Sequence, residues 1–411
     1  MLELYFGDRH VERLRQSKQI GDVIDGFACA LRADGYASYT ASKYLSAANH
    51  VARWAEGRHQ TVSGMAERDW EAFVAHLGTC HCFSHRKGQR GAARAGADAF
   101  LEHLRTLGIA PPAEDKAPPV PPLMQGFLAW MHQRGVRERT LEAYVAVLVE
   151  FAEALGPDPA AFTAVEIRRF ILEQAARGKP GMTRRAISAV RAFMRYLVAN
   201  GRCAPALIAA VPTIASWRLT SLPKYLSASD VERVVSASDS STSGLRDHAI
   251  VLLLARLGLR AGDVASLRLN DLDWRRSRVR VVGKSRRQAW LPLPQDVGDT
   301  ILAYLEHARP KSQVAHVFLR VHAPLKQMGA HCVGSVVRSA MRRAGIKAPA
   351  RGAHVLRHSA ATGMLQQGAN LDLIGAILRH KSPETTAIYS KVDVAALREV
   401  AQPWISVEVS Q

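Results

Sequence analysis

The sequence predicts a mainly α-helical protein, in which two helical N-terminal domains precede a mixed α/β domain with a small antiparallel β-sheet. Three observations support this fold class. The length of 411 residues suits two or three domains rather than one. Apolar residues recur at helical spacing through most of the chain. One hairpin pattern rich in valine follows the second helical region, at 278–293.

Composition points to a polyanionic partner. Hydrophobic residues make up 48% of the chain, enough to bury sizeable cores, so global disorder is not expected. Lysine and arginine number 55 against 36 acidic residues, a net charge of +19 that favours nucleic acid as the partner. A membrane surface is the weaker alternative, because no basic amphipathic anchor stands out.

Neither a membrane span nor a secretory leader is expected. The longest apolar run, 249–259, is interrupted by Arg256 and is too short to cross a bilayer, so it predicts a buried core helix. The N-terminus carries no basic segment followed by an apolar one. Five scattered cysteines without disulfide-type spacing predict a reduced, cytoplasmic protein.

Two breaks divide the chain. The proline-rich stretch 111–122 cannot continue a helix and predicts a linker. Helical periodicity lapses again near 215–223, before Ser227 and Asp230 signal the start of a new helix. The predicted domains are therefore an additional N-terminal helical domain at 1–110, a second helical domain at 123–216 and the mixed domain at 217–411.

The two helical domains resemble each other. Five residues recur at a constant offset of about 100 positions, and each threonine among them is expected to cap a helix. We interpret this as two domains of similar plan and a duplication; a chance likeness between Ala/Leu-rich helices is the alternative. The five are Gly26, Phe27, Gly35, Thr40 and Tyr44, matched by Gly126, Phe127, Gly135, Thr140 and Tyr144.

Basic residues gather near the end of the second helical domain. Three of the arginines, at 184, 191 and 195, have spacings that can share one helix face, which suits phosphate contacts. A merely solvated face is the alternative for any one of them. The candidate DNA-binding residues here are Lys179, Arg184, Arg185, Arg191 and Arg195.

The mixed domain carries groups suited to phosphate chemistry. Arg260 directly follows the buried apolar helix, where a charged side chain needs a paired anion. Asp263, three residues on, is expected to orient the Arg260 guanidinium, and a plain ion pair is the alternative. Lys284 stands at the tip of the hairpin formed by 278–282 and 288–293, where its ammonium can act as a general acid once its pKa is lowered. Two neighbours add candidate contacts to the DNA backbone: Arg286 and Arg287.

Two further segments add histidines, an arginine and a tyrosine. His354 and Arg357 share one face at the start of a helix, so one can exchange a proton while the other holds a phosphate; the adjacent His358 is expected to pack internally. Ser382 and Pro383 predict a helix start between His380 and Tyr389. Tyr389 is either a core aromatic or a nucleophile whose phenolate nearby cations stabilise.

With these residues assembled, the C-terminal half resembles the tyrosine recombinases, the phage-integrase family. The resemblance covers roughly Leu123 to Tyr389 and includes the second helical domain, which looks like the family's SAM-like core-binding domain. Asp263 stands where glutamate is commoner, and Arg379 replaces a frequent glycine. The matching segments are 257–267 for the first arginine motif, 282–293 for the lysine hairpin, 354–358 for the second box and 378–389 for the nucleophile segment.

The resemblance implies a site-specific DNA recombinase or integrase that needs neither ATP nor a metal. Tyr389 would attack a phosphodiester, forming a 3′-phosphotyrosyl link and freeing a 5′-hydroxyl. Lys284 would protonate the leaving 5′-oxygen, and His354 would assist proton removal from the tyrosine. Three residues would stabilise the charge of the phosphorane: Arg260, Arg357 and His380.

The resemblance also implies partners. The first partner is double-stranded DNA that carries a specific site. The second is the protein itself, as a homotetramer that exchanges strands through a Holliday junction. Sister recombinases are further candidate partners, and no membrane is expected to be involved. Such a protein would be bacterial and nucleoid-associated, and would integrate or transpose a mobile element. The tail at 394–407 would dock on a neighbouring protomer. Two alternatives are a type IB topoisomerase-like relaxing enzyme and a catalytically silent accessory DNA-binding protein.

One cluster in the first domain is left unexplained by the resemblance. Three of its members form a weak zinc candidate, because their spacing departs from the usual Cys-x2–4-Cys form. Free cysteines beside DNA-contacting residues at 85–87 are the favoured interpretation. The cluster comprises His76, Cys80, His81, Cys82 and His85, and the zinc candidates are Cys80, Cys82 and His85.

Overall fold

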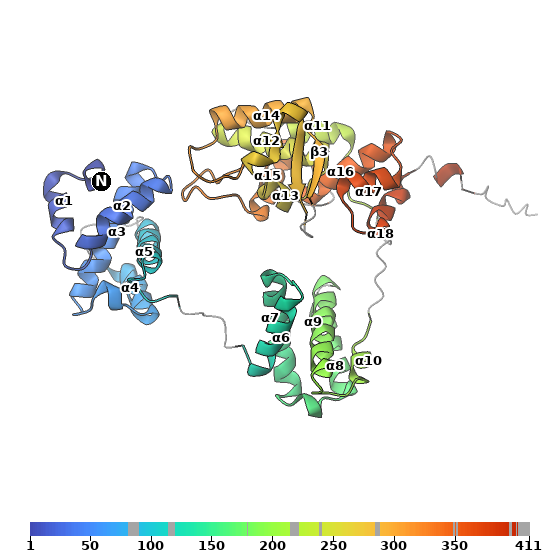
Figure 1. Cartoon of the computed structure of the whole chain (residues 1–411), viewed down its shortest axis with the longest axis horizontal. Helices are drawn as coiled ribbons and strands as arrows, with labels where there is room; N and C mark the ends of the chain where they lie inside the picture. Colours follow the sequence, from blue (N-terminus) through green and yellow to red (C-terminus); the bar gives the residue numbers. More distant parts are fainter. Residues whose placement is uncertain are drawn as a thin grey trace, which may run out of the picture. The chain divides into compact units, whose positions relative to one another are not determined.

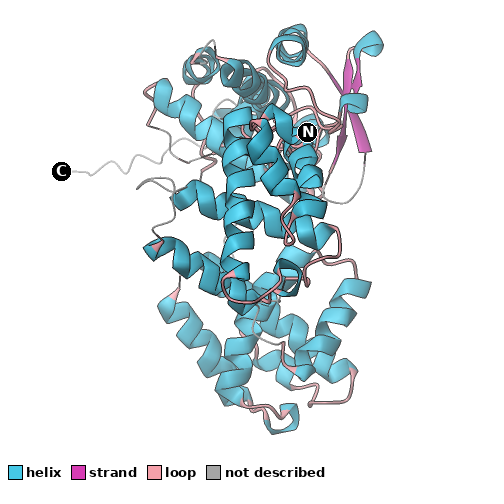
Figure 2. Ribbon diagram, turned by 90° about the vertical axis from the view of Figure 1, so that its left-hand side faces the viewer, coloured by secondary structure: helices cyan, strands magenta, loops and turns pink. Residues whose placement is uncertain are grey.

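The computed structural model describes residues 1–80, 90–113, 120–178, 180–213, 222–237, 241–283, 288–347, 350, 352–393, 397–399 and 401. The described part is mainly helical with one small antiparallel sheet, which confirms the predicted fold class (Figures 1 and 2). Contacts group Glu114–Arg218 into one compact unit and Met1–Ala113 with Leu219–Gln411 into another. The three-domain division stays a prediction.

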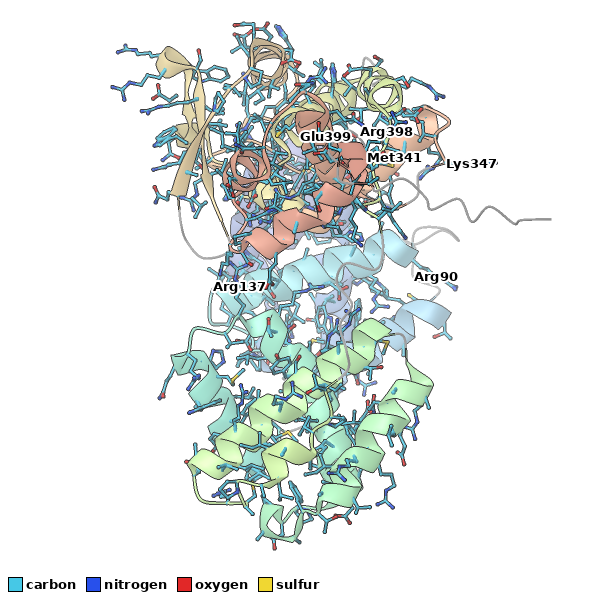
Figure 3. All side chains as sticks on the ribbon, turned by 90° about the vertical axis from the view of Figure 1, so that its right-hand side faces the viewer. Arg90, Arg137, Met341, Lys347, Arg398 and Glu399 are labelled. Carbon is cyan, nitrogen blue, oxygen red and sulfur yellow. The ribbon has the colours of Figure 1, made fainter. Side chains whose placement is uncertain are left out.

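The N-terminal region is entirely helical where it is described, and its apolar side chains form a core of their own. α3 and α4 both pack against α5, whose first residue, Arg90, is labelled in Figure 3. The elements are η1 (Leu2–Leu4), α1 (Asp8–Arg15), α2 (Gly21–Ala33), α3 (Ser38–Glu56), η2 (Val62–Gly64), α4 (Glu67–Thr79) and α5 (Arg90–Thr106).

The second helical region has a separate core. Pro122, which the sequence places at the end of the linker, is the first residue of α6, since proline suits the first turn of a helix. Arg137, also labelled in Figure 3, precedes α7. The elements are α6 (Pro122–Gln133), α7 (Glu138–Leu155), η3 (Pro159–Ala161), α8 (Ala164–Arg177), α9 (Pro180–Ala199) and α10 (Leu207–Ala210).

The two helical regions repeat one packing arrangement. Phe27 packs on Phe100 with ring centroids 5.1 Å apart, and Phe127 packs on Phe193 at 5.4 Å. Gly35 and Gly135 both take left-handed conformations, with φ of 78° and 73°, just after the first helix of each pair. The recurring residues of the sequence therefore occupy equivalent places.

The prediction that the recurring threonines cap helices is wrong. α3 begins at Ser38 after Ala37, and α7 begins at Glu138 after Arg137, so Thr40 and Thr140 lie inside the first turn. Neither start has a side-chain cap. Helix boundaries depend on the packing of the preceding turn as well as on capping preference.

The C-terminal region is built around α12, which packs against α11, α13, α14, α15 and α16. The predicted core helix is confirmed, because Ala249–Leu254 are all buried within it. The elements are α11 (Ala228–Ser236), α12 (Thr242–Leu257), α13 (Ala261–Ala265), η4 (Leu269–Asp271), β1 (Leu272–Asp273), η5 (Trp274–Arg276), β2 (Arg278–Val282), β3 (Gln288–Pro292), α14 (Gln295–His307), α15 (Ala330–Arg343), α16 (Ala353–Gln366), α17 (Leu371–Leu378), α18 (Pro383–Thr386) and η6 (Ala387–Val392).

The predicted hairpin is present and belongs to a three-stranded antiparallel sheet in the order β1-β2-β3. Val279 lies opposite Leu291, and both face the core, while Val282 pairs with Gln288 at the open end of the hairpin. Three candidates that the sequence places between β2 and β3, namely Lys284, Arg286 and Arg287, lie outside the described residues.

A glycine joins α12 to the elements that follow. Gly258 ends the helix with φ of 58°, and a Cβ at this position would lie 2.6 Å from Cδ2 of Leu378. Only glycine accepts both the left-handed conformation and this close approach. The chain can therefore turn sharply and present Arg260 beside the end of α17.

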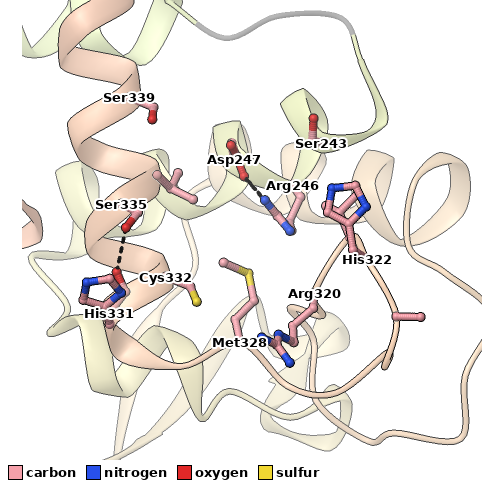
Figure 4. Close-up of a pocket in the computed structure, with 13 residues that line it drawn as sticks. Ser243, Arg246, Asp247, Arg320, His322, Met328, His331, Cys332, Ser335 and Ser339 are labelled. Atoms are coloured by element: carbon pink, nitrogen blue, oxygen red, sulfur yellow. Dashed lines mark hydrogen bonds and ion pairs between the residues drawn. The ribbon is translucent and has the colours of Figure 1, made fainter. Parts of the chain in front are cut away.

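A cavity of about 730 Å³ opens between α12, the loop after Phe318 and α15 (Figure 4). Arg246 and Asp247 form an ion pair on its wall, and Arg320 and His331 face it from the loop and from α15. None of the five catalytic candidates among the described residues lines this cavity. Separately, no helix in the described part of the chain is long and apolar enough to span a bilayer.

Candidate active site

Arg357 is the most deeply buried charged candidate. It lies near the start of α16, at the fifth residue, and is 3% exposed, which confirms the predicted helix start. Nη1 donates to the carbonyl oxygen of Gly258 at 2.5 Å, and Nη2 donates to that of Leu378 at 2.6 Å. Burial, and then the nearby Arg260 cation, lower its pKa to about 10. The guanidinium thus joins the ends of α12 and α17.

Arg260 binds the residue that follows Leu378. Its Nη2 donates to the carbonyl oxygen of Arg379 at 3.3 Å. The two guanidinium groups of Arg260 and Arg357 therefore hold consecutive carbonyls, those of Leu378 and Arg379, immediately before His380. Each guanidinium has five N–H donors, so these bonds use only part of its capacity.

The expected orientation of Arg260 by Asp263 needs correction. The buried Asp263 carboxylate accepts from the backbone N–H of Arg260 at 3.1 Å, and its ion-pair partner is the Arg379 guanidinium. Asp263 and Arg379 are the two positions where the sequence departs from the common family pattern. The departures therefore compensate each other as one buried ion pair.

This ion pair also explains an unusual backbone conformation. Arg379 has φ of 56°, in the left-handed region where glycine is favoured and other residues are uncommon. The bond to Asp263 holds the side chain in place, and the Arg379 carbonyl accepts from Arg260. Strain at such a position persists only where surrounding contacts enforce it.

His354 and His358 lie one turn apart on α16, with ring centroids 4.6 Å apart. His354 is exposed at the surface. Its pKa is lowered, first because one edge of the ring is packed away from water and then because the Arg357 and Arg260 cations lie nearby. Nδ1 of His358 lies 2.9 Å from the hydroxyl oxygen of Tyr389. The sequence interpretation of His358 as an internal packing residue missed this contact. The i, i+4 spacing of His354 and His358 places the two rings on the same helix face, and this spacing was the sequence signal for a shared role.

Tyr389 is buried, with 1% of its surface exposed, among Ala361, Ile374 and Leu378. Burial raises its pKa to about 12, against a smaller lowering by Arg357. Ser382 caps α18 by accepting from the Glu384 N–H at 3.3 Å, as predicted, and η6 then carries the tyrosine.

His380 completes the cluster. Its ring lies parallel to that of Tyr389, at 6.5 Å between centroids and an interplanar angle of 7°. Nδ1 lies 2.7 Å from the hydroxyl oxygen of Thr386. Burial, and then Arg357 and Arg260, lower the pKa of His380 to about 4; burial, then His354, has the same effect on His358. Both rings are therefore neutral at physiological pH, with nitrogens available as hydrogen-bond partners.

The predicted basic face of α9 divides into two roles. Arg184, Arg185 and Arg195 are exposed, as a phosphate-binding face requires. Arg191 instead donates through Nη2 to the carbonyls of Val211 and Pro212 and to the hydroxyl of Thr213, at 3.1 to 3.3 Å. It thereby anchors the chain after α10, and DNA contact by Arg191 stays a prediction, as it does for the three exposed arginines. Lys179 lies outside the described residues.

Comparison with known proteins identifies the family. The model of the phage integrase family matches residues 224–395, and that of the phage integrase N-terminal SAM-like domain matches 124–201. A putative integrase/recombinase of Sinorhizobium fredii, y4rA, is 42% identical over 66% of this chain and 68% of its own. The chain belongs to the phage integrase family of tyrosine recombinases. It is thus an enzyme of a DNA strand-transferring family.

Other relatives extend the likeness. The putative integrase/recombinase y4rF of S. fredii is 30% identical over 98% of this chain and 96% of its own, so its likeness includes the N-terminal helices. The tyrosine recombinase XerD of Listeria monocytogenes is 31% identical over 68% of this chain and 96% of its own. The fold matches XerH bound to difH substrate, with TM-score 0.56 and 16% identity over 82% of this chain and 94% of that chain. It also matches a lambda integrase dimer bound to a core site, with TM-score 0.53 and 17% identity over 70% and 98%.

The ion pair between Asp263 and Arg379 can be tested by a double-mutant cycle. Arg379→Gly alone should destabilise the protein by about 3 kcal/mol, because it leaves a buried carboxylate unpaired, and Asp263→Asn alone should also destabilise it, because it leaves the Arg379 guanidinium unpaired. The double variant Asp263→Asn, Arg379→Gly should recover much of this loss, since it removes the charge and gives the left-handed position its preferred residue. Denaturant unfolding measures both. Strictly additive losses from the single variants would show that the pair is not coupled.

Stability should fall in acid because of His358 and His380. An unfolded histidine binds its proton near pH 6.5, whereas these two bind theirs near pH 4 in the folded state. The unfolded chain therefore holds more protons between these values, and stability is lost as pH falls from about 6.5 towards 4. Thermal unfolding at stepped pH should show a shallower loss for His358→Phe than for the parent. His322→Gln, at an exposed histidine, is the control, and an equal slope in all three proteins would contradict the assignment.

Proposed function

We propose that this protein is a site-specific recombinase that cuts and rejoins DNA strands through a 3′-phosphotyrosyl intermediate, and that it integrates or transposes a mobile element. One observation carries the proposal. Arg260 and Arg357 hold the consecutive carbonyls of Leu378 and Arg379, so two cations, His380 and the hydroxyl of Tyr389 meet around one short segment. This is the set of groups that phosphoryl transfer without a metal needs.

In the proposed reaction, the Tyr389 oxygen attacks the phosphorus of a DNA strand as the bond to the 5′-oxygen breaks. The N–H donors of Arg260 and Arg357 and the ring of His380 stabilise the charge on the phosphorane oxygens. Lys284 supplies the proton to the leaving 5′-oxygen. In the rejoining step a 5′-hydroxyl attacks the phosphotyrosyl bond and releases Tyr389. The energy of the broken diester is retained in that bond.

The tyrosine proton has two candidate acceptors. His358 is hydrogen-bonded to the hydroxyl of Tyr389, and with Nδ1 unprotonated it accepts from that hydroxyl. His354, the acceptor that the family resemblance implies, packs against His358 one turn away. We assign the direct contact to His358, with His354 positioned to exchange the proton with solvent from the surface.

Tyr389 is held in a resting arrangement before DNA binds. Burial and a pKa of about 12 oppose formation of the phenolate. The hydrogen bond to His358 keeps the hydroxyl beside its proton acceptor while the phenol stays neutral. The enzyme thereby restrains its nucleophile until a substrate is present.

The proposed partner is double-stranded DNA with a specific recombination site. The net charge of +19 and the exposed Arg184, Arg185 and Arg195 of α9 support backbone contacts. A tetramer that exchanges strands through a Holliday junction, alone or with sister recombinases, is the proposed working assembly. A lambda integrase tetramer has been solved on a Holliday junction, and its fold matches with a TM-score of 0.53.

A type IB topoisomerase-like activity would use the same chemistry, and an accessory DNA-binding role would use none of it. Recombination is favoured over relaxation because the relatives y4rA, y4rF and XerD are named as recombinases. The accessory role is disfavoured because no described catalytic position has lost its functional group.

A suicide substrate that carries the cognate site should trap the proposed intermediate. The parent protein should form a covalent adduct between Tyr389 and DNA, which denaturing electrophoresis detects, and Tyr389→Phe should form none because it lacks the attacking oxygen. Tyr225→Phe is the matched control and should keep the adduct. An adduct that persists in Tyr389→Phe places the nucleophile elsewhere. Specific binding without an adduct in the parent favours the accessory role.

The proton acceptor can be distinguished by single-turnover cleavage of the same substrate. His358→Ala should slow cleavage by about 10²-fold or more, within the range for loss of a general base, with DNA affinity unchanged. His354→Ala should slow it less. A larger loss of cleavage rate in His354→Ala than in His358→Ala would identify His354 as the acceptor of the tyrosine proton. Circular dichroism of both variants checks that the helix α16 is intact.

A further inference from the structure

The N-terminal region contains a compact cluster of potential metal ligands that recombination does not use. His50 lies in α3, His76 lies in the last turn of α4, and Cys80 ends α4. One ligand atom from each lies within 4.8 Å of the other two. The three side chains connect α3 with α4. His50 is not among the residues of the His/Cys cluster that the sequence predicts.

The distances fit a tetrahedral zinc ion. Nε2 of His50 lies 3.3 Å from Nε2 of His76 and 3.5 Å from Sγ of Cys80. Zn–N bonds near 2.05 Å and Zn–S bonds near 2.3 Å place two ligand nitrogens about 3.3 Å apart, and a nitrogen and a sulfur about 3.6 Å apart. The two observed separations therefore match two edges of such a tetrahedron.

Hydrogen bonding alone accounts less well for this arrangement. A neutral imidazole nitrogen either carries a proton or offers a single lone pair, so Nε2 of His50 cannot donate to one neighbour and accept from the other. A cation removes this conflict, because both nitrogens and a thiolate can direct lone pairs at one point. Thiolate together with imidazole is the donor set that zinc prefers.

The surroundings are those of a built site rather than a surface cluster. His50 is 5% exposed, and Cys80 is buried as well. The ring of Phe73 packs edge-on against His50 at 5.4 Å, and Trp54 lies beside both Phe73 and His76. This aromatic wall shields the ligand atoms on one side and so strengthens metal–ligand attraction.

We propose that His50, His76 and Cys80 provide three of the four ligands of a zinc ion that ties α3 to α4, with water in the fourth position. Both helices pack on α5, and the ion joins them directly where the chain leaves α4. This interpretation replaces that of free cysteines beside DNA contacts for Cys80. The original zinc candidates Cys82 and His85 lie outside the described residues.

The test uses the full chain, purified without chelator, and measures bound metal by mass spectrometry. We expect about one zinc per chain in the parent, and loss of at least ten-fold in metal affinity in His76→Asn and in Cys80→Ser. The controls in the same region are Cys29→Ser, at an exposed cysteine, and His59→Asn, whose left-handed φ of 54° asparagine tolerates. Both controls should retain the metal.

Cobalt gives a direct signature of the ligands. Chelator-stripped parent protein titrated with Co²⁺ should develop the visible bands of a tetrahedral site and a thiolate charge-transfer band. The charge-transfer band should vanish in Cys80→Ser and persist in Cys29→Ser. Metal removal should also lower the unfolding temperature of the N-terminal region by more than about 5 °C.

Two results would overturn the proposal. One is a parent protein that contains no zinc as purified and takes up neither Zn²⁺ nor Co²⁺ after stripping. The other is a metal retained equally by His76→Asn and Cys80→Ser, which would place it elsewhere. These readouts involve no DNA cleavage, so they stand independently of the recombination chemistry.

Discussion

The buried guanidinium of Arg357 is the interaction on which the C-terminal region depends. A cation with 3% exposure must have its donors satisfied, and the carbonyls of Gly258 and Leu378 satisfy two of them. The bonds that stabilise the charge also hold the end of α12 against the end of α17. The side chain of Arg357 therefore contributes both to stability and to the shape of the candidate active site.

The compensation between Asp263 and Arg379 follows from the same constraint. Arg260 donates to the carbonyl of Arg379, where the chain takes a left-handed conformation that glycine adopts most readily. In this chain an arginine takes that conformation, and a buried carboxylate holds it. The two changes lie far apart in the sequence but form one ion pair in the structure. Arg379 also adds a positive charge near Arg357.

Electrostatics also set the resting state of the site. Burial first, and then the neighbouring positive charges, keep the half-buried His358 and His380 neutral, while burial keeps the Tyr389 hydroxyl protonated. A bound phosphate would change this balance, because its negative charge offsets that of the arginines and raises the proton affinity of the histidines beside them.

The sequence by itself determined the helical class, the hairpin, the buried core helix and five described catalytic candidates, because periodicity, capping and ordered motifs are local signals. Helix starts at Thr40 and Thr140 were wrong, since packing of the preceding turn overrides capping preference. Only tertiary structure decided that His358 contacts Tyr389, that Arg191 anchors a loop, and that His50 joins His76 and Cys80. Each of these contacts links segments far apart in the chain, and no local pattern encodes which distant partner a side chain will meet.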